Sequence, residues 1–397
     1  MQPSLRFPEF KDKWEKKRLG NLSSQSMYGI GASAVEFDKK NVYVRITDID
    51  EDTRRIIGDY TSPDNIDEKY LLEKNDILFA RTGASTGKTY IHSKFNETLK
   101  YYFAGFLIKF KIKDNYSSKF IYQYTFTEMY KNWVKVMSVR SGQPGINSEE
   151  YSKLSLYIPK KEEQEKIGIF FSKLDQQIEL EEKRIELLEQ QKRGYMQKIF
   201  SQGLRFKDEE GNYYKEWNTK QLKDVLEFSN KRTTNENEYP VLTSSRQGLI
   251  LQSDYYKDGK TFAESNIGYF ILPKNYITYR SRSDDGIFKF NLNQIIDVGI
   301  ISKYYPVFKG INTNQYYLTL HLNYRLKKEY IKYATGTSQL VLSQKNLQNI
   351  QTKLPSYEEQ TKIANFLSEL DKLIEKQSDK VELLKDRKKG LLQKMFV

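Results

Sequence analysis

The sequence predicts an α+β protein in which two mixed α/β globular regions alternate with two long helices. Three observations predict this fold: an internal repeat at an offset of 196 residues, apolar residues at heptad spacing inside the repeat, and aromatic-rich, strand-like stretches before each copy. A chain of 397 residues is also too long for one ordinary core. The duplication implies a pseudo-twofold internal repeat.

The repeat is clearest at the start of each expected helix. Residues 159–175 (PKKEEQEKIGIFFSKLD) resemble residues 355–371 (PSYEEQTKIANFLSELD), and the match continues without a gap to the end of the second copy. Before each globular region a weaker echo occurs, because an Arg-Phe pair at Arg6 recurs at Arg205. The chain therefore reads as globule, helix, globule, helix.

Each repeat carries the apolar seam of a coiled coil, with steps of three and four residues. The seam residues that we expect to form the helix contact are Leu174, Ile178, Ile185, Leu188, Leu370, Ile374, Val381 and Leu384. Polar residues interrupt both seams at matching places, Glu181 with Gln377 and Lys192 with Lys388. An ordinary core helix would also show heptads, but matched interruptions favour two antiparallel coiled-coil helices that pair with each other.

Four segments follow from the repeat: globular regions at 1–158 and 204–354, and helical spacers at 159–203 and 355–397. Within the globular regions we expect a helix over 120–136. Short apolar runs predict strands at 42–46, 76–80, 106–110, 269–272 and 276–279.

Of the net charge of +13, +12 lies outside the two expected helices, in the globular regions. Residues 160–200 hold nine basic and nine acidic side chains, so the expected helix is neutral and does not resemble a basic membrane-binding helix. Two cationic globules suit a polyanionic partner, and nucleic acid is the commonest one. We therefore expect double-stranded DNA as a partner and no membrane.

Composition also excludes several kinds of chemistry. The chain has no cysteine and two histidines, which leaves little for a metal site or an acid–base relay. Two adjacent prolines, part of a motif expected in amino-methyltransferases, do not occur, and an acidic group at 63–69 is interpreted as a charged turn. We expect no catalytic residue, metal or cofactor. The longest apolar run, 101–108, is too short to span a bilayer, so a cytoplasmic location is expected.

The stretch Arg81 to Tyr90 (RTGASTGKTY) resembles a phosphate-binding loop. Its first glycine lies at position 83, one residue too late, and strand-like residues rather than a helix follow it. We interpret it as a hairpin whose tip reaches into a DNA groove, with a solvated hairpin as the alternative. The candidate DNA-binding residues here are Arg81, Thr82, Ser85, Thr86 and Lys88.

Further candidates come from the second half and from the strip before each long helix. Residues 276–286 occupy the equivalent place to the first hairpin, and the strip 139–147 matches 335–343. Arginine pairs with guanine and glutamine with adenine. These candidates are Arg140, Gln143, Arg246, Arg280, Arg282 and Gln339. In the same strips we interpret Asn147 and Ser343 as helix caps.

With these motifs in place, the layout resembles the specificity subunit of type I restriction-modification systems. The resemblance rests on Glu162-Glu-Gln164 and Glu358-Glu-Gln360 in the two helices, and on the strand-turn 76–88. It implies target recognition domains that each read one half of a gapped asymmetric site. It also implies helices that set the gap and dock two methyltransferase subunits, with restriction subunits joining the complex. The alternative is a coiled-coil scaffold whose two globular domains bind proteins.

Overall fold

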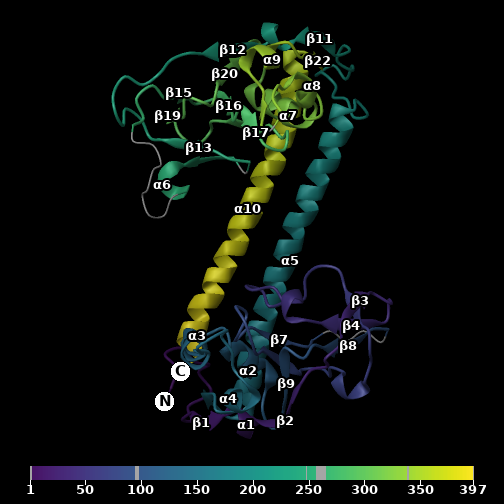
Figure 1. Ribbon diagram of the computed structural model, residues 1–397, viewed down its shortest axis with the longest axis vertical. Helices are drawn as coiled ribbons and strands as arrows, with labels where there is room; N and C mark the ends of the chain where they lie inside the picture. The colour runs from purple at the N-terminus through teal and green to yellow at the C-terminus, as the bar shows by residue number, and fades with distance from the viewer. Residues whose placement is uncertain (1, 94–97, 247, 256–264, 338, 397) are drawn as a thin grey trace. The chain divides into compact units, whose positions relative to one another are not determined.

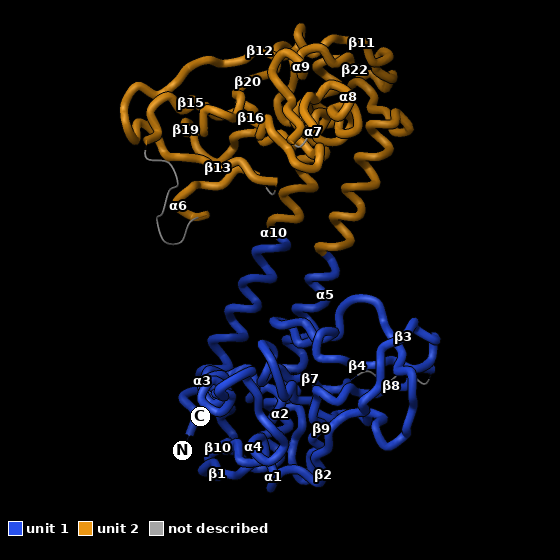
Figure 2. The backbone as a smooth tube through the Cα atoms, in the orientation of Figure 1, with its two compact units in different colours: residues 1–184, 377–397 blue, residues 185–376 orange. Residues whose placement is uncertain are grey.

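The computed structural model describes residues 2–93, 98–246, 248–255, 265–337 and 339–396. The chain forms two compact units, unit 1 (residues 1–184 and 377–397) and unit 2 (residues 185–376), coloured separately in Figure 2. The long helices are α5 (Lys161–Phe200) and α10 (Tyr357–Met395), each labelled in Figure 1. Each unit contains one globular region and a part of both long helices.

Unit 1 begins and ends its globular region with strands. The strands are β1 (Glu15–Arg18), β2 (Ser23–Tyr28), β3 (Ala34–Glu36), β4 (Asn41–Val44), β5 (Thr61–Pro63), β6 (Ile77–Ala80), β7 (Thr89–Ile91), β8 (Lys100–Phe103), β9 (Leu107–Ile112) and β10 (Ser155–Ile158). The helices are α1 (Leu19–Leu22), α2 (Ser118–Tyr124), α3 (Glu128–Met137) and α4 (Ser148–Ser152), with 3-10 turns η1 (Ile46–Asp48) and η2 (Glu68–Tyr70).

The centre of unit 1 is an antiparallel sheet in the order β2-β9-β6-β7. All four residues of β6 are buried, because both faces of the sheet are covered. Ile77 and Phe79 join one core with residues of α2 and α5, whereas Leu78 and Ala80 join a second core with β4 and β8. The alternation of side chains along a strand thus divides one apolar run between two cores.

Unit 2 repeats this plan. Its strands are β11 (Asn218–Gln221), β12 (Leu226–Ser229), β13 (Leu242–Ser244), β14 (Leu249–Leu251), β15 (Phe270–Pro273), β16 (Ile277–Tyr279), β17 (Arg282–Ser283), β18 (Phe290–Leu292), β19 (Val298–Ile301), β20 (Val307–Gly310), β21 (Leu340–Val341) and β22 (Gln351–Leu354). The helices are α6 (Gln252–Tyr255), α7 (Gln315–Tyr324), α8 (Tyr330–Tyr333) and α9 (Gln344–Gln348), with the 3-10 turn η3 (Leu222–Asp224).

The central sheet of unit 2 has the order β12-β20-β16-β18, which is the order of unit 1 with each strand replaced by its counterpart. The sheets around it differ, since unit 1 has a parallel β4–β8 pair where unit 2 has antiparallel β13–β14 and β15–β19 pairs. The duplication predicted from the repeat is therefore confirmed for the central sheet and the helices. The β4–β8 pair of unit 1 and the β13–β14 and β15–β19 pairs of unit 2 are specific to their units.

Each globular region closes on itself where it begins and ends. In unit 1, β1 pairs with β10, and the Leu19 amide donates to the Leu154 carbonyl at 2.8 Å. In unit 2, β11 pairs with β22, and the Leu222 amide donates to the Ile350 carbonyl at 2.9 Å. The entry and the exit of each region therefore lie side by side.

The predicted seam is the contact between α5 and α10. In unit 1, Ile178, Val381 and Leu384 are buried, while the neighbouring Leu180 and Leu383 are 68% and 69% exposed. In unit 2, Leu370 is buried and Ile185, Leu188 and Ile374 are half-buried. The helices run antiparallel in both units, as expected.

Each polar interruption of the seam contacts a polar residue of the facing helix. Glu181 and Gln377, the matched pair, hydrogen-bond directly to one another in unit 1. Lys388 forms an ion pair with Asp175 in unit 1, and Lys192 repeats it with Asp371 in unit 2. Each interruption thus has a partner on the facing helix, so that a shift in register would break these contacts as well as the apolar seam.

The Glu-Glu-Gln motif fastens each globular region to its helix. Glu163 accepts two hydrogen bonds from the Arg6 guanidinium, at 2.6 and 2.7 Å, and Arg205 binds Glu359 in the same way in unit 2. Both glutamates are almost fully buried. The adjacent Gln164 accepts from the Ser117 amide, where α2 begins. The faint Arg-Phe echo in the sequence therefore marks one arm of a repeated ion pair.

The helix expected over 120–136 is two helices, α2 and α3, separated at residues 125–127. Thr127 separates the two helices because its hydroxyl accepts a hydrogen bond from the Tyr130 amide as the N-cap of α3.

The strand that follows the hairpin at 81–88 is β7, as predicted. No helix within the described residues is long and apolar enough to cross a membrane.

Candidate nucleic-acid interface

The two candidate segments of unit 1 lie next to each other. Thr82 forms a β-bridge with Gly145, and the Ile146 amide donates to the Arg81 carbonyl at 2.9 Å. We call residues 81–87 together with 140–146 the unit 1 tip. The sequence predicted both segments separately, and the structure brings them together.

Arg81 and Gln143 are the exposed candidate base-binding residues of this tip. The Arg81 guanidinium lies over the ring of Tyr28 at 4.9 Å, and Tyr28 is itself exposed. The Gln143 amide nitrogen lies 3.1 Å from the place of a Cβ at Gly83. Gly83 has a φ of 75°, so the turn favours glycine there and leaves room for the amide.

The other predicted residues of the first hairpin are less exposed. Thr82, Ser85 and Thr86 are half-buried, and the Thr86 hydroxyl donates to the Gly83 carbonyl at 2.7 Å, which closes the turn. The expectation that Lys88 lies at the tip and binds DNA is wrong. Its ammonium is buried, donates to the Ile49 carbonyl at 2.9 Å and pairs with Glu51 at 2.8 Å, because the side chain points away from the tip into the domain.

Arg140 lies on the surface, and its guanidinium is engaged within the chain. It binds both carboxylate oxygens of Glu150 at 2.6 Å and donates to the carbonyls of Met137 and Val139. Glu150 also closes the capping box of α4 with Asn147. The interpretation of Asn147 and Ser343 as helix caps is confirmed.

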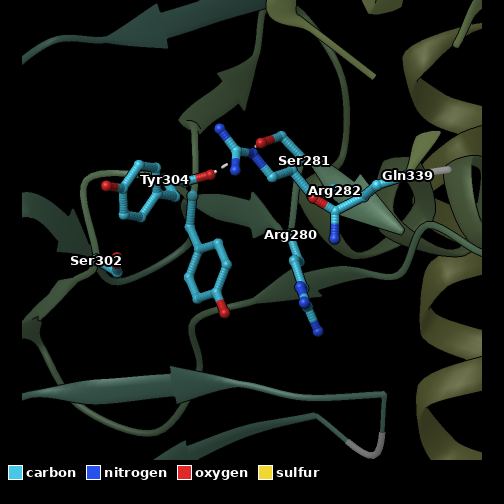
Figure 3. A pocket seen from close by; sticks show the side chains of 7 residues that line it. Arg280, Ser281, Arg282, Ser302, Tyr304 and Gln339 are labelled. Atoms are coloured by element: carbon cyan, nitrogen blue, oxygen red, sulfur yellow. Dashed lines mark hydrogen bonds between the residues drawn. The ribbon is translucent and has the colours of Figure 1, made fainter. Parts of the chain in front are cut away.

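In unit 2 the two equivalent segments also lie next to each other. Arg282 pairs with Val341, and the Leu342 amide donates to the Ser281 carbonyl at 2.9 Å. We call residues 280–286 and 339–342 the unit 2 tip. A pocket of about 250 Å³ opens there, shown in Figure 3 and lined by Arg280, Ser281, Arg282, Ser302, Tyr304, Tyr305 and Gln339.

The strand register shows which residues correspond. Ile77 pairs with Phe110 on β9, and Ile277 pairs with Phe308 on β20. Counting outward from these positions, Arg81 corresponds to Ser281. The two hairpins occupy equivalent places, as predicted, but the second hairpin carries its arginines on either side of the position equivalent to Arg81. Gln143 and Gln339 do correspond, as predicted.

The cations of the unit 2 tip differ in their surroundings. Arg280 is exposed, and its side chain has no hydrogen bond, ion pair or ring contact with any residue that the structure describes. The Arg282 guanidinium lies 5.5 Å from the ring of Tyr304. Arginine over an exposed tyrosine therefore occurs in both tips. Tyr28 and Tyr304 were not predicted from the sequence, since neither has a characteristic spacing to its arginine.

Two carboxylates hold the remaining candidates. Arg246 pairs with Asp285 at 2.6 Å, and the Gln339 amide donates to Asp284 at 2.8 Å. A hydrogen bond from Ser283 is the main cause that lowers the pKa of Asp285. Arg246 and Gln339 must exchange these partners if they are to bind DNA.

No group of three or more potential metal-ligating side chains occurs in the described part of the chain. The two histidines are not exposed at the tips. His321 is enclosed beside Thr352, with 2.7 Å between the imidazole Nε2 and the hydroxyl, and His92 is also buried.

Comparison with known proteins decides the family. The model of the type I restriction modification DNA specificity domain matches residues 11–190 and again residues 214–383. The chain belongs to this specificity family. One match falls in each half of the chain, which agrees with the duplicated sheet and helix. DNA recognition is the role of the family, and the two tips are the candidate places for it.

Relatives and solved structures agree with this assignment. The type I restriction enzyme MjaVIII specificity subunit of Methanocaldococcus jannaschii is 25% identical over 351 residues, covering 81% of this chain and 78% of the relative. The putative MjaX specificity subunit of the same organism is 26% identical over 282 residues, covering 65% and 63%.

The type I S subunit from M. genitalium has a TM-score of 0.63 at 17% identity and covers 100% of this chain and 99% of its own. A chain from a study of complex assembly and conformational transition of the type I R-M system has a TM-score of 0.51 at 14% identity, covering 98% of both chains. These structures share the fold of this specificity-family chain.

Proposed function

We propose that this chain is the non-catalytic subunit that reads DNA, and that the tip of each unit binds one half of a gapped, asymmetric site. The observation that carries the proposal is the repeated tip, in which two segments meet in the same register and carry exposed arginine together with a glutamine at a matching position. The frame is the same in both units, whereas the residues on it differ. One chain would then read two different half-sites.

The unit 1 tip has the chemistry to read bases in a major groove. Arg81 can donate two hydrogen bonds to a guanine, and Gln143 can bind an adenine edge in two places. The ring of Tyr28 restricts the Arg81 guanidinium, so less conformational entropy is lost when it binds. Thr82 and Ser85 remain candidates for phosphate contacts beside these two readers.

The unit 2 tip carries two arginines around one opening. Arg280 is free of partners in the described chain, and Arg282 lies over Tyr304 in the same pocket. We expect one of these arginines to read guanine and the other to contact a phosphate, since both lie around one small opening. Gln339 would leave Asp284 to bind a base.

The helices are the proposed docking place for two methyltransferase subunits, and restriction subunits would join the larger complex. The seam residues are enclosed between α5 and α10, so they hold the helix pair and leave docking to the outward face. Apolar side chains outside the seam are more than half exposed in each unit, Leu180 and Leu383 in unit 1 and Leu187 and Leu373 in unit 2. The study of complex assembly that includes a structural neighbour supports such partners.

We further propose that the chain needs no cofactor, that methylation and cleavage are carried by its partners, and that it works in the cytoplasm. The coiled-coil scaffold with two protein-binding domains is the alternative. It would not require glutamines at matching positions of both tips with arginines beside them, which is why DNA reading is preferred.

A salt titration of the full chain on DNA separates the two functions. If the tips bind DNA, the logarithm of the association constant falls with the logarithm of salt concentration, by about 0.9 for each phosphate contact. Selection from a pool of duplexes with randomised bases should then recover two defined half-sites around a fixed gap. A flat salt dependence with no selected sequence would favour the scaffold.

A further inference from the structure

Residues 49–56 of unit 1 form a compact turn under the hairpin. The Asp50 carboxylate accepts the Thr53 amide and the Thr53 hydroxyl, both at 2.7 Å, and the Arg54 amide donates to the Asp50 carbonyl at 3.1 Å. These hydrogen bonds from Thr53 lower the pKa of Asp50. Arg54 has a φ of 54°, in the left-handed region, so tertiary contacts must hold it there.

Two buried cations join this turn to the base of the recognition hairpin. Lys88, the residue that closes the hairpin, donates to the Ile49 carbonyl and pairs with Glu51. In the opposite direction, the Arg54 guanidinium hydrogen-bonds to the hydroxyl of Thr89 on β7. The hairpin and the turn therefore hold each other through one cation from each side.

Arg54 extends the same network to the helices behind the sheet. Its guanidinium donates to the Thr125 hydroxyl at 2.8 Å and lies 4.2 Å from the ring of Phe126. Lys388 of α10 lies 4.0 Å from the same ring. Phe126 is thus contacted by a cation from the turn and by another from a long helix.

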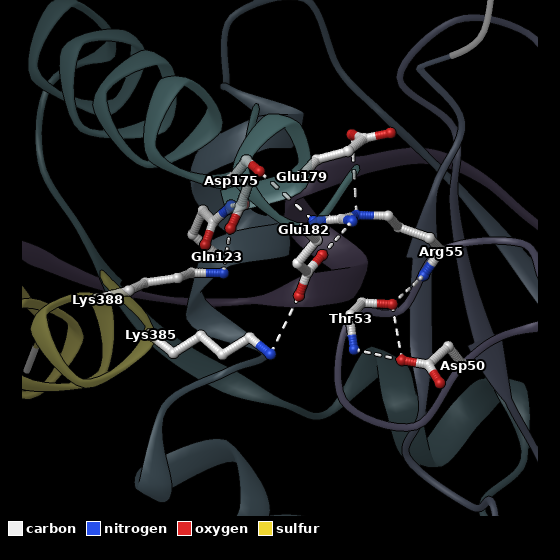
Figure 4. Close-up of polar contacts among 9 residues, drawn as sticks. All are labelled: Asp50, Thr53, Arg55, Gln123, Asp175, Glu179, Glu182, Lys385 and Lys388. Atoms are coloured by element: carbon white, nitrogen blue, oxygen red, sulfur yellow. Dashed lines mark hydrogen bonds and ion pairs between the residues drawn. The ribbon is translucent and has the colours of Figure 1, made fainter. Parts of the chain in front are cut away.

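Arg55, the next residue, attaches the turn to α5 directly (Figure 4). Its guanidinium pairs with Glu182 at 2.9 Å and donates to the Asp175 carbonyl at 3.5 Å. The other carboxylate oxygen of Glu182 pairs with Lys385 of α10 at 3.0 Å. One continuous set of contacts therefore leads from both long helices through the turn to the hairpin that carries Arg81.

Unit 2 has a lysine at the equivalent position, but the described residues of that unit make no polar contact with it. The pairing of β7 with β6 and of β18 with β16 makes Lys289 the counterpart of Lys88. The Lys289 side chain has no hydrogen bond or ion pair to the residues described for unit 2. Burial lowers its pKa, and the neighbouring Lys192 and Lys327 lower it further. Among the residues that the structure describes, the attachment of this lysine to a turn is therefore seen in unit 1.

We propose that Lys88, Arg54 and Arg55 are positioning residues for the first half-site, and that the turn transmits the placement of α5 to the unit 1 tip. This inference rests on the proposed function. A bidentate contact to a base depends on a guanidinium held in one plane. A hairpin released from the turn would still fold, since its strands pair in the central sheet, but its tip would sample several placements.

Arg55 is the residue to test, because its pair with Glu182 is partly exposed. The two side chains retain 31% and 24% of their accessible surface, and ion pairs of this kind contribute little to stability. A role limited to folding therefore predicts little effect of Arg55→Ala on any property. A positioning role predicts a loss of base selectivity at the first half-site with an unchanged melting temperature.

The experiment selects duplexes with the full-length chain, randomising the first half-site while the second is fixed, and then the reverse. We expect Arg55→Ala to lower the preference for the best base at the first half-site by about tenfold, to leave the second half-site unchanged, and to be rescued by Arg55→Lys. Glu182→Gln should behave like Arg55→Ala. Lys111→Ala, which removes an exposed ion pair with Glu73 in the same unit, is the matched control and should change neither half-site.

Unaltered selection by both Arg55→Ala and Glu182→Gln would overturn the proposal, and so would equal loss at both half-sites. Failure of the parent chain to select any sequence is a different result, because it would overturn the proposed DNA-reading function itself. The second half-site thus serves as an internal standard for the first.

Discussion

Lys388 on α10 forms an ion pair with Asp175 on α5, with 2.6 Å between the ammonium nitrogen and the carboxylate oxygen. Asp175 also accepts a hydrogen bond from Gln123 of α2 at 2.7 Å. Burial is the main cause that lowers the pKa of Lys388. The pair therefore connects both long helices and the globular region of unit 1 through one carboxylate.

We expect Lys388→Ala to lower the free energy of unfolding by roughly 2 kcal/mol, less than for a fully buried pair because Asp175 keeps 31% of its side-chain surface. Lys192→Ala, which removes the equivalent pair with Asp371, should cost less, since Asp371 is 43% exposed. Denaturant titrations of the two variants check the order. A larger loss of unfolding free energy for Lys192→Ala would show that burial does not determine the strength of these ion pairs.

Arg81→Ala should relax the choice of one base in the half-site read by unit 1, at a cost of about 1–3 kcal/mol for the correct base. The other half-site should be unaffected, because the units have separate tips. Duplex selection with each half randomised in turn provides the measurement. Loss at both halves would assign Arg81 to the fold.

Arg280→Ala tests the unpartnered cation of unit 2. If Arg280 contacts a phosphate, the variant binds every sequence more weakly and the slope of log affinity against log salt becomes shallower by about one. If it reads guanine, the salt slope changes little and selectivity at one position falls. Binding titrations at several salt concentrations distinguish these contacts, and unchanged binding would exclude both.

The stability of the chain should decrease in mild acid because of His321. Complete burial lowers the pKa of His321 to about 3, whereas an unfolded histidine titrates near 6.5. Below pH 6.5 the unfolded chain binds the proton preferentially, so stability is lost progressively between pH 6.5 and pH 3. The expected loss from pH 6.5 to pH 5 is about 2 kcal/mol.

His321→Gln is the control for that prediction, because the amide nitrogen of glutamine can replace the imidazole Nε2 beside Thr352 and does not titrate. The variant should show a flatter dependence of unfolding free energy on pH over the same range. If parent and variant have the same pH dependence, other groups cause it.

The gap between the half-sites is testable by lengthening both helices. We expect one heptad inserted after Ile185, together with a matching heptad in α10, to widen the permitted gap by about 10 Å or three base pairs. The half-sites themselves should stay the same. Selection with spacers of different length provides the measurement, and an unchanged gap would contradict a spacing role for the helices.

The sequence predicted the parts of this fold in which apolar residues recur at regular spacing. The heptad seam, its paired interruptions and the strands around β6 all follow from spacing, and the structure confirms them. The single helix expected over 120–136 was wrong because apolar spacing continues across Thr127, where a hydroxyl cap starts a new helix. A local hydrogen bond thus outweighed the pattern.

The tips were only partly predictable for a different reason. Arg81 and Gln143 were found as polar residues beside strands, but the direction of each side chain depends on strand register. The strand register directs the Lys88 side chain inward, where it pairs with Glu51. It also makes Arg81 of unit 1 the counterpart of Ser281 in unit 2. The turn at 49–56 and the tyrosines under the arginines come from distant parts of the chain, so no local pattern indicated them.

The joined entry and exit of each globular region make it exchangeable as a cassette. Because Leu19 meets Leu154 as Leu222 meets Ile350, a chimera carrying the second region in place of the first would meet the same junction on the same helix. Such a chain would contain two copies of the same recognition domain, and its target site would contain the same half-site sequence twice.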